Sequence, residues 1–359
     1  MKRVAIIGTV GVPAGYGGFE TLVENIIGEN ASAGIEYTIF CSAMDCPDHP
    51  NTYKGARLRY INLHANGIHS VLYDGWSLMK CIRGYDVVVA LGVSGGLLFP
   101  VFKLLSRSRF IVNIDGLEWK RKKWGTLAKV ILHISERLAV IFADAVIADN
   151  QGIVDHVTRS YRKKSHLIAY GSDHVQRSVT EEQSAATLTS YGLVANEYAI
   201  TVCRIEPENN CHDILEAFAR CGKPLIFIGN WEKCNYGRQL RAKYSRYENI
   251  HIVEAVYDLD TLHILRTNCK YYIHGHSAGG TNPSLVEAMY CRCNIIAFDV
   301  VYNRATTEEQ AHYFKSCDDL VESLNGGEVA TTDNSEVMFE IAQRRYTWSV
   351  IARQYEALY

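Results

Sequence analysis

The stretch that decides the fold is KYYIHGHSAGGTNPSLVEAMYC, residues 270–291. Its first residues are aromatic and apolar, which predicts a short buried strand. A small polar loop with two adjacent glycines follows, and Asn282 is then suited to cap a helix that begins at Pro283. A strand, a glycine loop and a capped helix start form an anion site, because the free N–H groups of the first turn point outward.

Glu287 lies one turn inside this predicted helix, where its carboxylate is placed to accept hydrogen bonds from a ribose diol. The same pattern also fits an ordinary connection between a strand and a helix, in which the glycines serve only the turn. The two interpretations stay open for this stretch taken alone.

Strands and helices alternate on both sides of this stretch. The chain begins with RVAIIGT, a run of apolar residues without alternation that is typical of a buried parallel strand. With 359 residues the chain is too long for one core. It therefore predicts an α/β fold of two doubly wound, Rossmann-like domains that face a central cleft. The expected parts are a first domain over 1–172, a polar linker over 173–190, a second domain over 191–335, and closing helices over 336–359 that cross back to the first domain.

The net charge of −2 argues against a nucleic-acid partner. Residues 1–173 carry a balance of +5 and residues 174–359 a balance of −7, so we expect the first half to face an anionic partner or surface. The eleven cysteines are an odd number, and the chain starts directly with a strand rather than a secretory signal. These features predict reduced thiols in a cytoplasmic protein, and the absence of any long apolar run predicts at most a peripheral membrane contact.

A second glycine-rich loop, GTVGVPAGYGGFET (8–21), follows the first predicted strand. A dinucleotide fingerprint fails in detail here, because no G-x-G-x-x-G can be placed and Pro13 removes one N–H donor. A purely structural turn is one alternative. The interpretation we favour is a loop in which Gly15, Gly17 and Gly18 let the backbone close over a ligand held by the other domain.

The segment VNIDGLEWKRKKWG (112–125) carries two carboxylates, Asp115 and Glu118, after a predicted strand. Asp115 is expected at the cleft, where it could position or deprotonate an acceptor hydroxyl. Tryptophans flank four consecutive cations in a run typical of a membrane interface, although a solvated basic loop is the alternative. The residues of this predicted acceptor and membrane contact are Trp119, Lys120, Arg121, Lys122, Lys123 and Trp124.

Arg204 stands in TVCRIEPENN (201–210), after the first strand of the second domain. If Arg204 faces a phosphate site, its guanidinium would bind two phosphate oxygens in a bidentate manner. It would also neutralise the charge on the leaving diphosphate. A surface arginine paired with Glu206 or Glu208 is the alternative. The histidines of HGH (274–276) are a weak metal signal without a third ligand, so no metal is expected.

Together, GTVGVPAGYGGFETLVENI, DGLEWKRKKWG, RIEPENN and HGHSAGGTNPSLVEAM resemble the GT-B glycosyltransferases of the retaining family 4. Within it they look like the bacterial rhamnosyltransferases of capsule and O-antigen synthesis, which use dTDP-L-rhamnose and a lipid-linked saccharide acceptor. Two positions depart from the wider family. Gly279 stands where the first glutamate of an E-x7-E motif is usual, and Asn209 where a lysine is usual.

The resemblance implies a cytoplasmic transferase at the inner face of the cytoplasmic membrane, with a nucleotide sugar as substrate and no cofactor. Arg204, Asp115 and Glu118 are the implied catalytic groups. The implied donor-binding residues are Gly15, Gly17, Gly18, Arg204, Asn209, Gly279, Gly280, Thr281, Asn282, Ser284 and Glu287. Two rival functions remain, a nucleotide-sugar 2-epimerase of the same architecture and a non-catalytic subunit that binds a nucleotide sugar.

Overall fold

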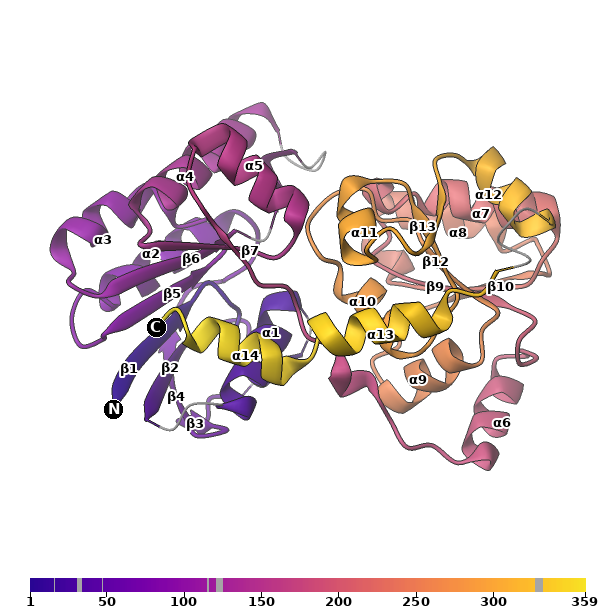
Figure 1. Ribbon diagram of the computed structural model, residues 1–359, viewed down its shortest axis with the longest axis horizontal. Coiled ribbons are helices and arrows are strands. Elements are labelled where there is room, and N and C mark those ends of the chain that lie inside the picture. Colours follow the sequence, from indigo (N-terminus) through magenta and orange to yellow (C-terminus); the bar gives the residue numbers. More distant parts are fainter. Residues whose placement is uncertain (16, 31–33, 47, 115, 121–124, 327–331) are drawn as a thin grey trace. The chain divides into compact units, whose positions relative to one another are not determined.

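The computed structural model describes residues 1–15, 17–30, 34–46, 48–114, 116–120, 125–326 and 332–359, except for the side chains of Ile68 and Glu118. It divides into two compact units (Figure 1): unit 1 is Met1–Gly171 with Trp348–Tyr359, and unit 2 is Ser172–Thr347. In these described residues, unit 1 has one sheet of eight strands in the order β3-β4-β2-β1-β5-β6-β7-β8, and unit 2 has one of six in the order β11-β10-β9-β12-β13-β14. Two α/β folds of the predicted kind are confirmed.

Unit 1 is built from apolar strands and amphipathic helices in alternation. Its strands are β1 (Lys2–Ile7), β2 (Ile35–Ser42), β3 (Thr52–Tyr53), β4 (Ala56–Ile61), β5 (Val87–Leu91), β6 (Arg109–Ile114), β7 (Ala145–Ala148) and β8 (His166–Leu167). Its helices are α1 (Gly18–Glu29), α2 (Ser70–Lys80), α3 (Phe99–Leu105), α4 (Thr126–Phe142), α5 (Gln151–Tyr161) and α14 (Trp348–Glu356). Short 3-10 turns precede three of them, at η1 (Gly67–His69), η2 (Gly96–Leu98) and η3 (Glu118–Lys120).

Helices cover both faces of this sheet. On one face, α1 and α14 pack into a common core through residues such as Leu22, Ile26 and Ile351. On the other, Phe99 and Phe102 of α3 place their rings 4.8 and 5.1 Å from that of Phe110 in β6, measured between centroids. The strands β3 and β4 are antiparallel, while β1 pairs in parallel with both β2 and β5.

The apolar positions of α4 do not form the inward stripe that is usual for a surface helix. Leu127, Val130 and Ile134 are exposed, and the side of the helix that faces the protein carries Ser135, Glu136 and Ala139 instead. Close packing against η2 decides which side of the helix is buried. A Cβ on Gly96 would lie 2.4 Å from the backbone oxygen of Ser135, so the two backbones meet without room for large side chains.

Unit 2 repeats the alternation. Its strands are β9 (Ala199–Val202), β10 (Leu225–Ile228), β11 (Ile250–Val253), β12 (Tyr271–His274), β13 (Ile295–Phe298) and β14 (His312–Phe314). Its helices are α6 (Glu181–Ser190), α7 (Cys211–Cys221), α8 (Asn235–Tyr244), α9 (Leu259–Thr267), α10 (Pro283–Tyr290), α11 (Val301–Thr306), α12 (Cys317–Asn325) and α13 (Ser335–Arg345). The 3-10 turns are η4 (Asp173–Val175), η5 (Pro207–Asn209) and η6 (Trp231–Lys233).

The segment expected as a linker is structured in large part. Its second half forms α6, which begins at a capping box in which Thr180 and Gln183 satisfy each other's backbone N–H groups. Leu188 is buried, and Asn268 of the neighbouring loop donates to Ser184. The segment is poor in apolar residues, which suggested a linker, because α6 buries only a narrow stripe of its surface.

The closing helices divide between the units. α13 belongs to unit 2, whereas α14 belongs to unit 1 and is fixed there through Trp348, which is buried. Gly171 makes room for this indole, because a Cβ at that position would lie 2.5 Å from the ring. Tyr355 in turn accepts a hydrogen bond of 2.6 Å from the buried amide of Asn113. All eleven cysteines are free thiols. The described helices include none with the length and apolar character to cross a bilayer.

Candidate functional site

The strand order of unit 2 reverses between β9 and β12, which are adjacent in the sheet but far apart in the chain. The strands there are parallel, so their carboxyl ends share one edge of the sheet. Ligands of open α/β sheets bind at such a switch point, outside the carboxyl ends. Arg204 follows β9 and the loop 275–282 follows β12. The two motifs predicted to hold the donor therefore meet at the point where the topology favours a ligand.

The loops that follow β9 and β12 are joined to each other by backbone contacts. A Cβ on Gly275 would lie 2.2 Å from the backbone oxygen of Asn209, so this glycine is required for the close approach. Asn210 donates its side-chain amide to the Gly275 oxygen at 2.9 Å, and the Ser277 N–H donates to the Glu208 oxygen at 2.8 Å. The site is consequently one rigid piece rather than two independent loops.

Asn209, which stands where the wider family has a lysine, has its side chain engaged inside the protein. Its Nδ2 donates to the backbone oxygen of Arg204 at 2.6 Å, and its Oδ1 contacts Nδ1 of the buried His276. Because Oδ1 only accepts, Nδ1 carries the proton of that contact. Nε2 lies 3.1 Å from the position that a Cβ on Gly279 would take. Both departures from the family pattern, Asn209 and Gly279, therefore adjoin His276.

The N-terminus of α10 has the predicted geometry. Asn282 is the N-cap, its Oδ1 accepts from the Ser284 N–H at 3.0 Å and from the Ser284 hydroxyl at 2.8 Å, and Pro283 opens the helix. Gly279 adopts a φ of 120°, a conformation that favours glycine. Gly280 and Thr281, which are also in the loop, are buried. The structure thus positions a helix N-terminus and its partial positive charge at the switch point.

Arg204 is half exposed at the same edge. Its Nε lies 4.0 Å from a carboxylate oxygen of Glu206, and both side chains are more than a third exposed. Such an exposed pair contributes little to stability, since solvent screens it. The guanidinium is therefore held near Glu206 only weakly and remains able to turn toward an anion.

Glu287 makes an ion pair that the sequence pattern does not indicate. Arg266 of α9 is 1% exposed in its side chain and donates from Nη2 to Oε2 of Glu287 at 2.5 Å. The Glu287 side chain is 20% exposed. An arginine behind the carboxylate fixes its orientation and keeps it available as an acceptor. Nothing in the sequence around Arg266 distinguishes it from a surface residue of an amphipathic helix.

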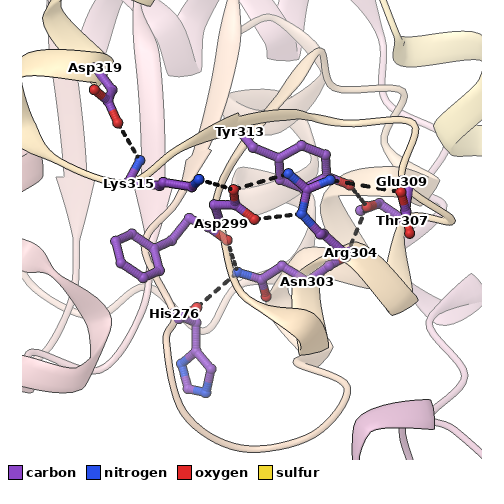
Figure 2. Close-up of polar contacts among 10 residues, drawn as sticks. His276, Asp299, Asn303, Arg304, Thr307, Glu309, Tyr313, Lys315 and Asp319 are labelled. Carbon is purple, nitrogen blue, oxygen red and sulfur yellow. Dashed lines mark hydrogen bonds and ion pairs between the residues drawn. The ribbon is translucent and has the colours of Figure 1, made fainter.

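A third element at this edge is the network after β13, shown in Figure 2. Asp299 accepts from Arg304 at 2.5 and 3.0 Å, and these bonds hold the pKa of Asp299 below its usual value. Lys315 approaches the same carboxylate at 3.5 Å. Asn303, next to Arg304 in α11, donates to the backbone oxygen of His276 at 2.8 Å. The network therefore anchors α11, and α11 anchors the glycine loop.

In unit 1 the glycine loop after β1 is braced by two carboxylates of α1. Glu20 is buried and accepts from the Thr9 hydroxyl at 2.9 Å and from the Val10 N–H at 2.8 Å. Glu24 accepts from the Ala14 N–H at 2.6 Å. Burial alone would raise the pKa of Glu24, but hydrogen bonds from Tyr53, Ala14 and Lys54 lower it on balance.

The predicted glycines of this loop differ in what surrounds them. A Cβ on Gly15 would meet nothing within 4 Å. Gly17 caps α1 with a φ of 135°, and a Cβ there would collide with the Glu20 carboxylate. Gly18 opens the helix close to the ring of Tyr170. Contact of this loop with a donor stays a prediction.

The acceptor residues predicted for unit 1 lie only in part within the described structure. Asp115 and Arg121–Trp124 lie outside the described residues, and so does the side chain of Glu118. Trp119 donates its indole N–H to the buried Glu136 at 2.8 Å, and Lys120 places its ammonium 5.3 Å from the Trp119 ring centre. The roles of these residues toward acceptor and membrane stay predictions.

Glu136 is a further polar centre, outside the motifs from which the site was predicted. Besides Trp119 it accepts from Tyr161 at 2.6 Å and contacts His156 Nε2 at 2.7 Å. This buried carboxylate raises the pKa of the Tyr161 hydroxyl, after burial itself as the larger cause. A signal for it existed, because a lone glutamate in the apolar sequence of α4 must find partners. The cluster fixes the segment 116–120 onto α4 and α5.

The structure of unit 1 also reveals a second glycine loop at its switch point, between β1 and β5. The loop after β5 contains Gly92, Gly95 and Gly96, and the Gly92 N–H donates to the Asn113 oxygen at 2.8 Å. The glycines at the end of a predicted strand were the available signal. Neither unit shows, among its described residues, a group of three or more His, Cys, Asp or Glu side chains placed to hold a metal ion.

Comparison with known proteins defines the class of this fold. Residues 193–323 match the family of glycosyl transferases group 1. Residues 1–173 match a family described as a domain of unknown function, DUF1972. The glycosyl transferases group 1 match lies within unit 2 and supports the broader part of the resemblance. No curated protein matches the chain.

Solved structures similar to the whole chain agree on the architecture. Sucrose-phosphate synthase from Thermosynechococcus elongatus has a TM-score of 0.81 at 18% identity, covering 100% of this chain and 98% of that one. HepE from Anabaena in complex with UDP has a TM-score of 0.73 at 13% identity, covering 99% of both chains. The catalytic domain of starch synthase IV from Arabidopsis thaliana, bound to ADP and acarbose, has a TM-score of 0.75 at 13% identity, covering 99% and 98%. At these identities the likeness shows the fold, which is GT-B as predicted.

Proposed function

We propose that this protein is a glycosyltransferase that moves a sugar from a nucleotide donor to an acceptor, with the donor held by unit 2. The observation that carries the proposal is the meeting of Arg204, the loop 275–282 and the α10 N-terminus at the switch point of a glycosyltransferase group 1 domain. Similar structures contain UDP, UDP-glucose or ADP, which supports a nucleotide sugar as the substrate.

In this proposal the diphosphate lies against Arg204 and the start of α10, and the ribose hydroxyls donate to Glu287. The Arg204 side chain can turn toward the diphosphate because its ion pair with Glu206 is weak. The ion pair with Arg266 holds the Glu287 carboxylate in a fixed orientation. The cation and the helix dipole stabilise the charge that develops on the leaving diphosphate. No metal is required for this role, since the stabilising charges belong to the chain itself.

The finer assignment is a retaining transfer of L-rhamnose from dTDP-L-rhamnose to a lipid-linked saccharide at the inner face of the cytoplasmic membrane. In a front-face reaction the acceptor oxygen bonds to the anomeric carbon on the side from which the diphosphate leaves. The acceptor proton passes to an oxygen of the leaving phosphate, and the products are a glycoside and a nucleoside diphosphate. The resemblance of the motifs to rhamnosyltransferases supports this assignment.

A ligand screen tests the donor. The full chain is melted with dTDP-, UDP-, GDP- and ADP-sugars, and the bound donor raises the melting temperature by mass action. Preferential stabilisation by dTDP-rhamnose supports the rhamnosyl assignment, whereas preference for a UDP or GDP sugar rejects it. Arg204→Ala should remove most of the shift in melting temperature. Arg246→Ala is the matched control, because Arg246 is an exposed arginine that contacts Tyr247 in the loop after α8.

Product analysis tests the reaction. With donor and an acceptor extract, the proposal predicts a glycosylated product together with free nucleoside diphosphate, both lost in Arg204→Ala. Incubation with donor alone should leave the sugar unchanged. An epimerised nucleotide sugar formed without acceptor would instead identify a 2-epimerase, and binding without any turnover would identify a non-catalytic subunit.

A further inference from the structure

Large apolar side chains are exposed on three neighbouring helices of unit 1. They include Leu72 and Trp76 on α2, Leu104 and Leu105 on α3, and Leu127 and Val130 on α4, each at least half exposed and Leu104 at 85%. We call these six residues the apolar face. Single exposed leucines are ordinary on protein surfaces, but a contiguous group marks an interaction site.

The helices that carry the apolar face pack against one another, and further exposed apolar side chains, Val101, Ile134 and Ile141, lie along α3 and α4. The helices α3 and α4 are in contact, and the turn η2 packs against both α2 and α4 (Figure 1). At one junction a Cβ on Gly75 would lie 2.7 Å from Leu98, and at the other Gly96 abuts the backbone of Ser135. All three helices cover the same face of the sheet, so their outward sides form one surface.

The charges on these helices have a single sign wherever they reach solvent. Within residues 70–83, 96–107 and 126–142, the only acidic residues are Asp74 and Glu136, and both are buried. The cations Arg83, Arg107 and Arg137 are exposed, and Lys80 places its ammonium 5.5 Å from the Trp76 ring centre. One acid at the border, Asp144 just beyond α4, neutralises Lys103 at 2.5 Å.

We infer that the apolar face rests on the surface of an anionic lipid bilayer, with its leucines and Trp76 among the acyl chains and its arginines at the phosphates. Only a partner that is both apolar and anionic over a broad area satisfies this surface. A second copy of the chain does not, because a symmetric contact would bring like-charged arginines together. The inference rests on the proposed function, for which it identifies the part of unit 1 that meets the membrane.

The experiment measures partitioning of the full chain onto vesicles by co-sedimentation. Vesicles of phosphatidylglycerol and phosphatidylethanolamine are compared with vesicles of phosphatidylcholine. The double variant Leu104→Ser, Leu127→Ser removes two exposed leucines, and Val194→Ser together with Tyr257→Ser, two exposed residues of unit 2, is the matched control. The variants leave residues 121–124 unchanged, so they separate the helices from the basic loop.

The wild-type chain and the control should bind the anionic vesicles, and raised salt or phosphatidylcholine should weaken the binding. The leucine double variant should bind the vesicles at least about tenfold more weakly than the wild type. Burial of even one such side chain in the bilayer changes the binding equilibrium by about tenfold. Unchanged binding of the double variant overturns the inference. A dimer seen by light scattering that the double variant abolishes, without vesicle binding, would instead assign the face to a second copy. Donor stabilisation in the melting assay is independent of these outcomes, so it tests the proposed function separately.

Discussion

Replacing Glu287 by alanine should destabilise unit 2 strongly, apart from any effect on ligand binding. Arg266 is fully buried, and Glu287 is the carboxylate that holds its Nη2. Within the described residues, the Nε and Nη1 atoms of Arg266 have no hydrogen-bond partner. Burial opposes the charge of the guanidinium and is the largest single influence, but the attraction of Glu287, together with smaller contributions from Cys291, Tyr272 and Cys293, raises the pKa of Arg266 on balance. Because an arginine guanidinium is not deprotonated in proteins, Arg266 stays charged when its partner is removed.

The size of the stability loss follows from leaving the buried Arg266 charge without its counter-charge. Breaking a buried ion pair from one side costs about 3–5 kcal/mol, because the remaining charge is left without a partner. For a unit of this size, that corresponds to a fall in melting temperature of roughly 6–20 °C. Glu287→Gln keeps an acceptor for Arg266 and should cost only about 1–2 kcal/mol. The double variant Arg266→Met, Glu287→Leu should regain most of the loss, since it removes both charges.

Scanning calorimetry of the full chain provides the measurement, with the transitions of the two units analysed separately. A melting temperature for Glu287→Ala within 2 °C of wild type would refute the reasoning. A double variant no more stable than Glu287→Ala would refute it as well. If the prediction holds, Glu287→Gln is the variant to use for testing ribose contact, because lost activity in Glu287→Ala would include lost folding.

Three other outcomes are expected. Burial raises the pKa of Asp74 to about 8 from 3.8, so the unfolded chain loses this proton first and stability falls as pH rises between about 4 and 8. Asp74→Asn should then melt increasingly above wild type across that window and equal it near pH 4, whereas a difference independent of pH contradicts the assignment. Gly15→Ala should leave the melting temperature unchanged while weakening sugar transfer. In contrast, Gly96→Ala should melt well below wild type, because its Cβ would lie 2.4 Å from a backbone oxygen. Asn209→Ala should lower the rise in melting temperature that a donor causes by more than it lowers the melting temperature of the ligand-free protein. Equal losses in the two quantities would mean that Asn209 has a purely structural role.

The sequence predicts the order of elements well because each strand and helix carries its own local signal. The strand before His276, the cap at Asn282 and the helix start at Pro283 are examples, since apolar runs and cap residues act within a few positions. The predicted linker is the exception among local features. There the capping box at Thr180 outweighs a composition that is poor in large apolar residues.

Contacts between distant segments could not be predicted in the same way. Arg266 and Glu287 are 21 positions apart, and only the fold of unit 2 brings their side chains together. The exposure of Leu127 likewise depends on the close approach of α4 to Gly96, which reverses the side that periodicity alone would bury. Periodicity states that a helix has an apolar side, and the fold determines what that side meets.

The two glycine loops at the switch points differ in charge, and this difference supports the proposal that unit 2 holds the phosphates of the donor. In unit 1 the loop's N–H groups at Val10 and Ala14 already donate to the carboxylates Glu20 and Glu24, so a diphosphate there would compete with two fixed anions. In unit 2 the loop is held by neutral amides, and the helix cap Asn282 is also neutral. Arg204 supplies a cation at the same edge. Two loops that look alike in sequence are therefore suited to different tasks, and the anionic part of a nucleotide sugar is matched by unit 2.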